Sequence, residues 1–261
     1  MSRLAAKRVL VTGAAQGVGA AIARRCANEG AQVVLADVLD DAGSALAGEI
    51  GAHYQHLDIT DAAQWQDAIA FVTTLFGGLD GLVNNAAILH MGPIETTSAD
   101  VVRRVLDVNL VGTYLGVQAA IKPLRASGGG SIVNIGSIDA NGGMNSVAAY
   151  SASKWGVRGL TRSAAIELGR DNIRVNAVHP ALGNPKMSAP WSDQFDGDRY
   201  LRHMPQPKLY RDGVPVQVTT EDSAAVVAYL LSDESAVCTG GDYMVDAGWT
   251  AGPFCPGLPG F

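Results

Sequence analysis

The chain has 261 residues, 48% of them hydrophobic and 17% charged, which excludes an intrinsically disordered protein and permits a large buried core. A net charge of −6 argues against nucleic acid as the main partner, and the longest apolar run, residues 224–231, is too short to cross a membrane. Three widely separated cysteines predict neither a disulfide framework nor a zinc cluster, and they favour a reduced, cytoplasmic location.

Short apolar runs alternate with longer segments of helical spacing through the first two thirds of the chain. The strand-like runs are residues 9–11, 33–35, 79–83, 132–135 and 175–178, and the helix-like segments are 19–28, 41–49, 62–76, 99–124 and 149–168. This alternation is typical of βαβ units around a parallel sheet that is buried on both faces. Right-handed crossovers then predict a Rossmann-type, doubly wound α/β sheet of about seven strands, with helices on both faces and ligands at the carboxyl ends of the strands.

No linker or break in composition divides the chain, so residues 1–261 are predicted to form a single domain. Residues 181–220 hold five of the eleven prolines, and they predict an excursion over the active-site face, either a lid or a surface loop without a role. A helix over 221–232 and a last strand at 243–245 should follow. The Gly/Pro-rich tail, 252–261, either packs across a subunit interface through its apolar side chains or is a frayed terminus.

The first strand is followed by a glycine-rich turn, from Thr12 to Gly19, that opens a helix. Glycines let backbone amides approach a pyrophosphate at the positive end of a helix, and such a turn is a weak signal by itself. Its position directly after a strand and about 20 residues before an acidic residue favours a dinucleotide site. The candidate cofactor contacts in the turn are Gly13, Gln16, Gly17, Val18 and Gly19.

The acidic residue is Asp37, at the end of the second strand. A carboxylate there accepts hydrogen bonds from the adenosine ribose and repels a 2′-phosphate. Its neighbours Gln16 and Val38 provide no base to bind that phosphate, so NAD is predicted over NADP. The alternative role for Asp37 is a helix cap ahead of Asp40 and Asp41.

Two further strand ends should line the adenosine side of the crevice. Asp58 and Ile59 follow the third strand, and Asn85 lies in the segment 84–87 after the fourth. Each is a candidate cofactor residue. The alternative for either segment is an ordinary turn.

The sharpest signal is the pair Tyr150 and Lys154, one turn apart on a predicted helix. An ammonium beside a phenol favours the phenolate, which makes Tyr150 a candidate general acid/base. Ser137 ends the fifth strand thirteen residues upstream, where its hydroxyl can hold a substrate oxygen.

With these residues assembled, the chain resembles the short-chain dehydrogenase/reductase family over residues 3–249. The matching motifs are Thr12 to Gly19, Asp58, residues 84–87, Asn109, Ser137, the pair Tyr150 and Lys154, and residues 173–176. The resemblance implies that Tyr150 is the acid/base, that Ser137 orients the substrate oxygen, and that Lys154 binds the nicotinamide ribose and lowers the pKa of Tyr150. It also implies that Asn109 anchors a relay water and that helices 99–124 and 149–168 build a homotetramer.

Three positions depart from the family pattern. Ala87 and Ala181 stand where the family usually has glycine, and Pro185 stands where a threonine commonly bonds the nicotinamide carboxamide. Because proline has neither a hydroxyl nor an amide proton, the backbone at Gly183 is the candidate replacement contact.

The resemblance implies reversible, NAD-dependent oxidation of a hydrophobic secondary alcohol to a ketone: a hydroxysteroid, an alicyclic alcohol or a monoterpene alcohol such as borneol. The candidate pocket walls are mostly apolar: Ile138, Met144, Val147, Met187, Trp191 and Met204. The alternatives are an NADPH-dependent 3-oxoacyl-thioester reductase and a catalytically silent dinucleotide-binding protein. The five histidines form no metal-ligand cluster, and no metal is expected.

Overall fold

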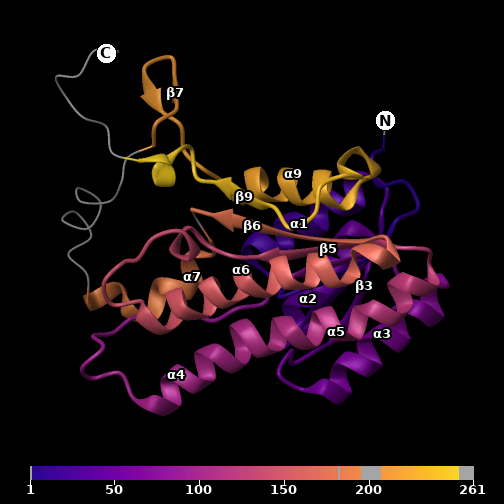
Figure 1. The fold of residues 1–261 in the computed structure, drawn as a ribbon, viewed down its shortest axis with the longest axis horizontal. Coiled ribbons are helices and arrows are strands. Elements are labelled where there is room, and N and C mark those ends of the chain that lie inside the picture. Colours follow the sequence, from indigo (N-terminus) through magenta and orange to yellow (C-terminus); the bar gives the residue numbers. More distant parts are fainter. Residues whose placement is uncertain (1, 182, 195–206, 253–261) are drawn as a thin grey trace.

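A seven-stranded parallel sheet forms the centre of the molecule in a computed structural model that describes residues 2–181, 183–194 and 207–252 (Figure 1). The strand order is β3-β2-β1-β4-β5-β6-β9. The strands are β1 (Arg8–Thr12), β2 (Gln32–Asp37), β3 (His53–His56), β4 (Gly81–Asn84), β5 (Gly130–Ile135), β6 (Ile173–Pro180) and β9 (Asp242–Val245). The predicted α/β fold class is confirmed.

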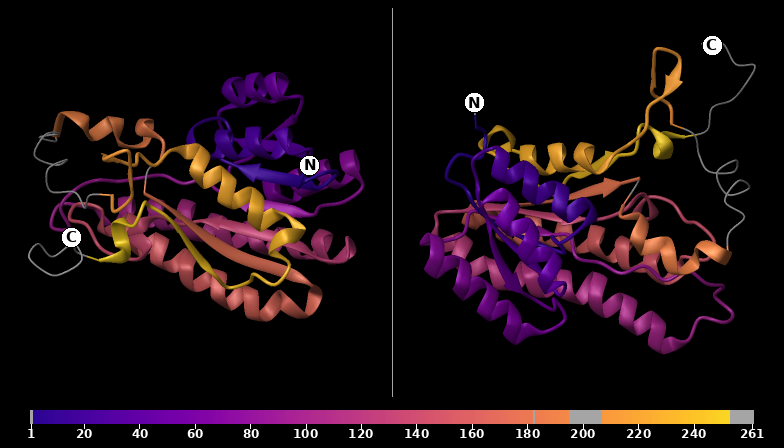
Figure 2. Two further views of the ribbon diagram at one scale, coloured as in Figure 1. Left: turned by 90° about the horizontal axis from the view of Figure 1, so that it is seen from above. Right: turned by 180° about the vertical axis from the view of Figure 1, so that it is seen from behind.

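Helices cover both faces of the sheet, as predicted (Figure 2). One layer consists of α1 (Gly17–Asn28), α2 (Asp40–Ile50) and α9 (Thr220–Leu231), and the other of α3 (Ala62–Phe76), α4 (Ala99–Leu106), α5 (Gly112–Ala126) and α6 (Ala148–Leu168). The strand order reverses at β1, which pairs with β2 on one side and β4 on the other. A doubly wound sheet opens a crevice at this point, outside the carboxyl ends of its strands.

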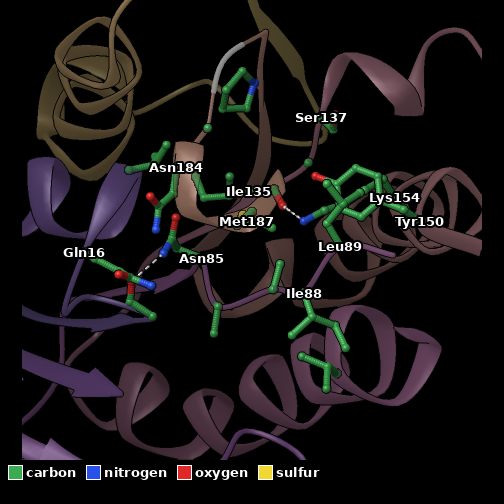
Figure 3. Close-up of a pocket in the computed structure, with 18 of the residues that line it drawn as sticks. Gln16, Asn85, Ile88, Leu89, Ile135, Ser137, Tyr150, Lys154, Asn184 and Met187 are labelled. Carbon is green, nitrogen blue, oxygen red and sulfur yellow. Dashed lines mark hydrogen bonds between the residues drawn. The ribbon is translucent and has the colours of Figure 1, made fainter. Parts of the chain in front are cut away.

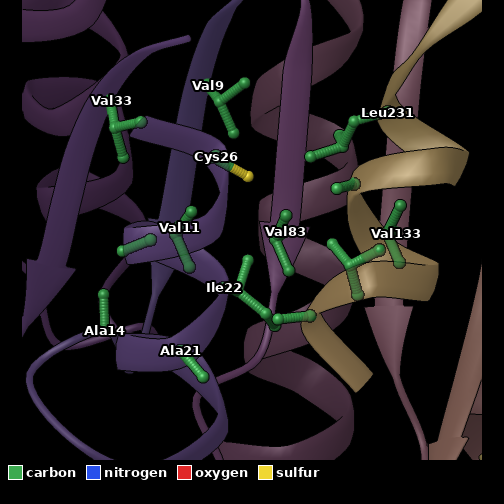
Figure 4. Close-up of a cluster of buried hydrophobic side chains, with 14 of the residues drawn as sticks. Val9, Val11, Ala14, Ala21, Ile22, Cys26, Val33, Val83, Val133 and Leu231 are labelled. Atoms are coloured by element: carbon green, nitrogen blue, oxygen red, sulfur yellow. The ribbon is translucent and has the colours of Figure 1, made fainter. Parts of the chain in front are cut away.

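The strands are apolar throughout because each face meets a helical layer. On β1, Val9 and Val11 pack beneath α1 and α9, whereas Leu10 packs on the opposite face against α3 and α5 (Figure 4). All three side chains are completely buried. A strand covered on one face alone would alternate apolar with polar residues instead.

The predicted helix over 99–124 is interrupted. Residues Asp107–Val111 form a π-helical turn between α4 and α5. The extra residue per turn accommodates Asn109, whose side chain is fully buried and hydrogen-bonded away from the helix. Such turns inside long helices frequently mark functional sites.

The excursion over 181–220 contains regular structure that the sequence reasoning did not predict. α7 (Pro185–Ser188) continues into a 3-10 helix (Ala189–Gln194), and β7 (Tyr210–Arg211) pairs with β8 (Val214–Pro215). The hairpin turn is Asp212-Gly213, with both φ angles positive (53° and 77°), and this Asp-Gly dipeptide is a signal that could have located it. Met204 and almost all of the tail 252–261 lie outside the described residues.

Within the described ranges, no helix combines the length and the apolarity that crossing a bilayer requires.

Candidate active site

A cavity of about 460 Å³ opens at the carboxyl ends of the strands (Figure 3). It brings together most of the predicted cofactor residues: Gly13, Gln16, Val18, Asp37, Asp58, Ile59, Asn85, Tyr150, Lys154 and Gly183. The predicted catalytic residue Ser137 lines it as well, whereas Asn109, Gly17 and Gly19 do not. Residues from almost every strand end therefore meet around one site, although the sequence separates them by up to 170 positions (Gly13 to Gly183).

The glycine-rich turn is held against the end of β4. The Asn85 side-chain amide donates to the carbonyl oxygens of Thr12 (2.9 Å) and Gly13 (3.0 Å). Gly19 permits this contact, because a Cβ there would lie 2.2 Å from the Gly13 oxygen and 2.4 Å from the Asn85 amide nitrogen. Gly19 therefore shapes the turn without lining the cavity.

Asp37 is held by backbone amides at the end of the cavity that lies at β2, called here the adenosine end because the adenosine of a dinucleotide is expected there. Its Oδ2 accepts from the amide of Ala15 (2.9 Å), and its Oδ1 accepts from the amides of Val38 (2.8 Å) and Leu39 (3.1 Å). The side chain is only 8% exposed. Asp37 thus accepts the amides that lead into α2, which agrees with the alternative interpretation, and it also joins the glycine-rich turn; its contact with a cofactor ribose stays a prediction.

Asp58 forms a turn with Thr60 and also lines the cavity. Its Oδ1 accepts hydrogen bonds from the Thr60 amide (2.9 Å) and hydroxyl (2.7 Å), and the amide bond is the main cause of its lowered pKa. Arg104, on α4, lines the same cavity, and its charge also lowers the pKa of Asp58. Sequence reasoning missed Arg104, because no predicted site residue lies one helical turn away from it.

Tyr150 and Lys154 share one face of α6, as predicted, but they interact differently from the expectation. The Lys154 ammonium donates to the carbonyl oxygen of Ile135 (2.8 Å) and lies 5.6 Å from the centre of the Tyr150 ring (Figure 3). Burial raises the pKa of Tyr150, which a hydrogen bond with Ser137 opposes, and burial lowers the pKa of Lys154 to about 8. The prediction that Lys154 lowers the pKa of Tyr150 is wrong for this structure, because the ammonium is directed at a carbonyl and the phenol has lost its water.

Ser137 contacts a carboxylate that sequence reasoning did not consider. Its Oγ accepts from the amide of Asp139 and donates to the Oδ2 of Asp139, both at 3.1 Å. Burial raises the pKa of Asp139. The signal available in the sequence was an acidic residue two positions after a strand-terminal serine.

A buried histidine fixes the backbone of Ser137. His179 is completely buried on β6, with Nδ1 at 3.3 Å from the Ser137 nitrogen and 3.0 Å from its oxygen, and with Nε2 at 3.0 Å from Asp242. Asp242 also binds Arg158 (2.8 Å) and Arg162 (2.6 Å). Burial lowers the pKa of His179, whose Nε2 meets the Asp242 carboxylate while its Nδ1 meets both the amide and the carbonyl oxygen of Ser137.

Asn109 does not line the cavity, but its side chain hydrogen-bonds the backbone of Ile88, which does. Its Nδ2 donates to the Ile88 oxygen (2.9 Å) and to the Ser153 hydroxyl (3.0 Å), and its Oδ1 accepts the Ile88 amide (2.8 Å). Ser153 in turn donates to the Tyr150 carbonyl (2.6 Å). Asn109 therefore positions Ile88 and the start of α6, and its predicted role as a water anchor stays a prediction.

The departures from the family pattern are accommodated. Ala87 and Gly183 line the cavity, and the Ala181 amide donates to the Val245 oxygen at 3.0 Å. Pro185 is the first residue of α7, a position that tolerates the missing amide proton. Of the expected walls, Met144, Val147 and Met187 line the cavity; Ile138 does not, and Trp191 packs edge-on against His90 with 5.8 Å between ring centres.

Comparisons with known proteins agree with this geometry. Residues 13–250 match the family model described as Enoyl-(Acyl carrier protein) reductase, a model of the short-chain dehydrogenases. The chain is 44% identical over 252 residues to a 3-alpha-(or 20-beta)-hydroxysteroid dehydrogenase of Mycobacterium tuberculosis, covering 96% of this chain and 92% of the relative. It is 41% identical over 261 residues to trans-4-hydroxycyclohexanecarboxylate dehydrogenase of Sinomonas cyclohexanicum, covering 96% and 95%. It is 37% identical over 258 residues to cyclopentanol dehydrogenase of Comamonas testosteroni, covering 96% and 100%.

The fold and the site thus define an oxidoreductase that uses a nicotinamide dinucleotide. The chain belongs to the short-chain dehydrogenase/reductase family, which confirms the resemblance inferred from its motifs.

Proposed function

We propose that this protein catalyses reversible, NAD-dependent oxidation of a hydrophobic secondary alcohol to its ketone. The observation that carries the proposal is the meeting of Ser137, Tyr150 and Lys154 in a cavity that apolar side chains such as Met144 and Met187 also line. Apolar walls suit an alicyclic, steroid or monoterpene ring, such as that of borneol. The relatives that act on hydroxysteroids and cyclic alcohols support the same substrate class.

The proposed chemistry removes a proton from the substrate hydroxyl and a hydride from the carbinol carbon. Ser137 holds the substrate oxygen, and the Tyr150 phenolate takes the hydroxyl proton as the carbonyl forms. The bound cofactor, held by Lys154 and the glycine-rich turn, supplies the nicotinamide ring that accepts the hydride from the carbinol carbon. Because burial raises the pKa of Tyr150, the phenolate fraction and the rate of alcohol oxidation should rise with pH.

Cofactor choice follows from the adenosine end. Asp37 places a carboxylate at the cavity, where it would accept from ribose hydroxyls and repel a 2′-phosphate. Arg104 is the one cation among the described residues that lines the cavity apart from Lys154, and its charge acts on Asp58. NAD is therefore the proposed cofactor.

The two rival functions have less support. An NADPH-dependent 3-oxoacyl-thioester reductase would have to place the 2′-phosphate of its cofactor beside Asp37. A silent dinucleotide-binding protein would have no reason to keep Ser137, Tyr150 and Lys154 together in the cavity.

Assembly and location belong to the same proposal. Large apolar side chains are exposed on α5 and α6, namely Tyr114 (52%), Trp155 (48%) and Ile166 (85%), and they provide a face for the proposed homotetramer. The cysteines Cys26 and Cys238 are free, which suits the reducing cytoplasm.

The deciding experiment follows nicotinamide reduction by absorbance, with NAD and NADP, over a panel of cyclic alcohols, steroids, monoterpenols and 3-hydroxyacyl thioesters. We expect turnover with NAD and an alicyclic or steroid alcohol. Turnover confined to NADP and a thioester would establish the first rival. Cofactor binding without turnover of any compound would establish the second.

A further inference from the structure

Asp139 is the one acidic residue at the catalytic end of the cavity among the described residues that line it; Asp37 and Asp58 belong to the adenosine end. It follows the fifth strand in a short 3-10 helix (Ile138–Ala140), and its carboxylate lies half-buried beside Ser137. Burial has removed part of the hydration of this carboxylate. It therefore requires either hydrogen-bond donors or a counter-charge.

The described residues provide the Asp139 carboxylate with only some of the hydrogen bonds that it can accept. The Ser137 hydroxyl donates to Oδ2 of Asp139, and no donor among the described residues reaches Oδ1. Lys154 is the one cation among the described residues that lines that end; its charge acts on Asp139, but its ammonium donates its hydrogen bond to the Ile135 carbonyl. One oxygen of this half-buried carboxylate thus remains available to a group that enters the cavity.

We propose that Asp139 selects substrates with a second hydroxyl group, and that it binds that hydroxyl while the first one reacts. This inference rests on the proposed function, because it uses the placement of the reacting oxygen at Ser137 and Tyr150. The substrate class is an alicyclic diol, and its product is the corresponding hydroxyketone.

The short distance between Asp139 and Ser137 indicates how far apart the two substrate hydroxyls would be. Asp139 Oδ2 lies 3.1 Å from Ser137 Oγ, the atom that would hold the reacting oxygen. A hydroxyl on the carbon next to the carbinol carbon then lies within reach of the carboxylate. A hydroxyl on the opposite side of a six-membered ring points away from it, so a vicinal diol fits best.

The same carboxylate disfavours anionic substrates. A substrate carboxylate near Asp139 would place two negative charges close together, and Lys154, the one cation among the described residues lining that end, already interacts with Asp139. This chain should therefore differ from its relative that acts on trans-4-hydroxycyclohexanecarboxylate, despite 41% identity.

The test compares cyclohexanol, cyclohexane-1,2-diol and cyclohexane-1,4-diol with the full-length enzyme and NAD. We expect kcat/KM for the 1,2-diol to exceed that for cyclohexanol by about tenfold or more, as a hydrogen bond to a charged group suggests. Asp139→Leu, which keeps the side-chain size, should reduce this ratio to near one. Asp139→Asn, which keeps an acceptor oxygen, should retain part of it.

The ratio is the informative readout, because any effect of the substitution on Ser137 alters both substrates alike and cancels. Met144→Leu, at another wall of the same cavity, is the matched control and should leave the ratio unchanged. If the wild type oxidises cyclohexanol and the 1,2-diol equally well, and Asp139→Leu does not alter the ratio, the inference is overturned while the proposed function stands. If no cyclic alcohol is oxidised with NAD, the proposed function fails instead.

Discussion

The two ends of the cavity satisfy their carboxylates in different ways. At the adenosine end, Asp37 accepts three backbone amides and Asp58 accepts the amide of Thr60. At the catalytic end, Asp139 accepts one side-chain hydroxyl, and burial raises its pKa. The adenosine end is thus completed by its own backbone, whereas the catalytic end contains polar groups that the protein satisfies only in part.

This difference agrees with the different roles proposed for the carboxylates at the two ends of the cavity. Backbone amides hold a carboxylate in one position, which suits a group proposed to discriminate between cofactors. Partly satisfied buried groups cost stability, and such groups concentrate where chemistry occurs. Substitutions at the catalytic end should accordingly reduce rate, and substitutions at the adenosine end should alter cofactor choice.

The largest effect is expected at Tyr150. Tyr150→Phe removes only the phenolic oxygen, so turnover should fall by about a thousandfold or more while NADH binding stays nearly intact. Steady-state kinetics and NADH fluorescence titration measure the two quantities. A variant that keeps a tenth of the activity would show that another group acts as the base.

Cofactor choice comes next. The wild type should prefer NAD over NADP by more than about 100-fold in kcat/KM, because a 2′-phosphate would meet the Asp37 carboxylate. Asp37→Asn keeps the size and the acceptor oxygen but removes the charge, and it should reduce the preference for NAD over NADP in kcat/KM. Equal use of both cofactors by the wild type would contradict the role assigned to Asp37.

Substitution of Lys154 should show that burying this ammonium lowers the free energy of unfolding. The pKa of Lys154 is about 8 in the folded protein and about 10.4 in the unfolded chain. Between these pH values the folded state binds fewer protons than the unfolded state. Lowering the pH through this range therefore reduces the free energy of unfolding. Lys154→Met should raise the free energy of unfolding at pH 7 by about 1–3 kcal/mol while impairing both turnover and cofactor binding. The stability difference should shrink as pH rises from about 8 towards 10, which urea denaturation at several pH values measures. A variant less stable than the wild type at pH 7 would overturn this account.

The smallest effect is expected at His179, which acts through Ser137. His179→Leu removes the acceptor of the Ser137 amide, and kcat/KM should fall by about tenfold because the hydroxyl loses its fixed position. His179→Asn can still accept that amide and should recover part of the activity. If the two variants behave alike, packing at this position matters more than the hydrogen bond.

Much of this protein is determined by local sequence. Apolar runs such as Val9 to Val11 specify buried strands, the turn from Thr12 to Gly19 specifies the entry to α1, and the spacing of Tyr150 and Lys154 places both on one helix face. Even the edge position of β3 agrees with its polar residues, His53 and His56. These features depend on short-range sterics and periodicity, which a sequence displays directly.

Tertiary structure decided what depends on distant neighbours. It placed the Lys154 ammonium on Ile135, brought Arg104 to the cavity, and set His179 beneath Ser137. It also reversed the expected direction of the Tyr150 pKa, because desolvation depends on everything packed around the phenol and not on its helical neighbour alone. The sequence identifies the residues proposed to perform the chemistry, whereas their charge states and hydrogen-bond partners depend on how the fold packs them.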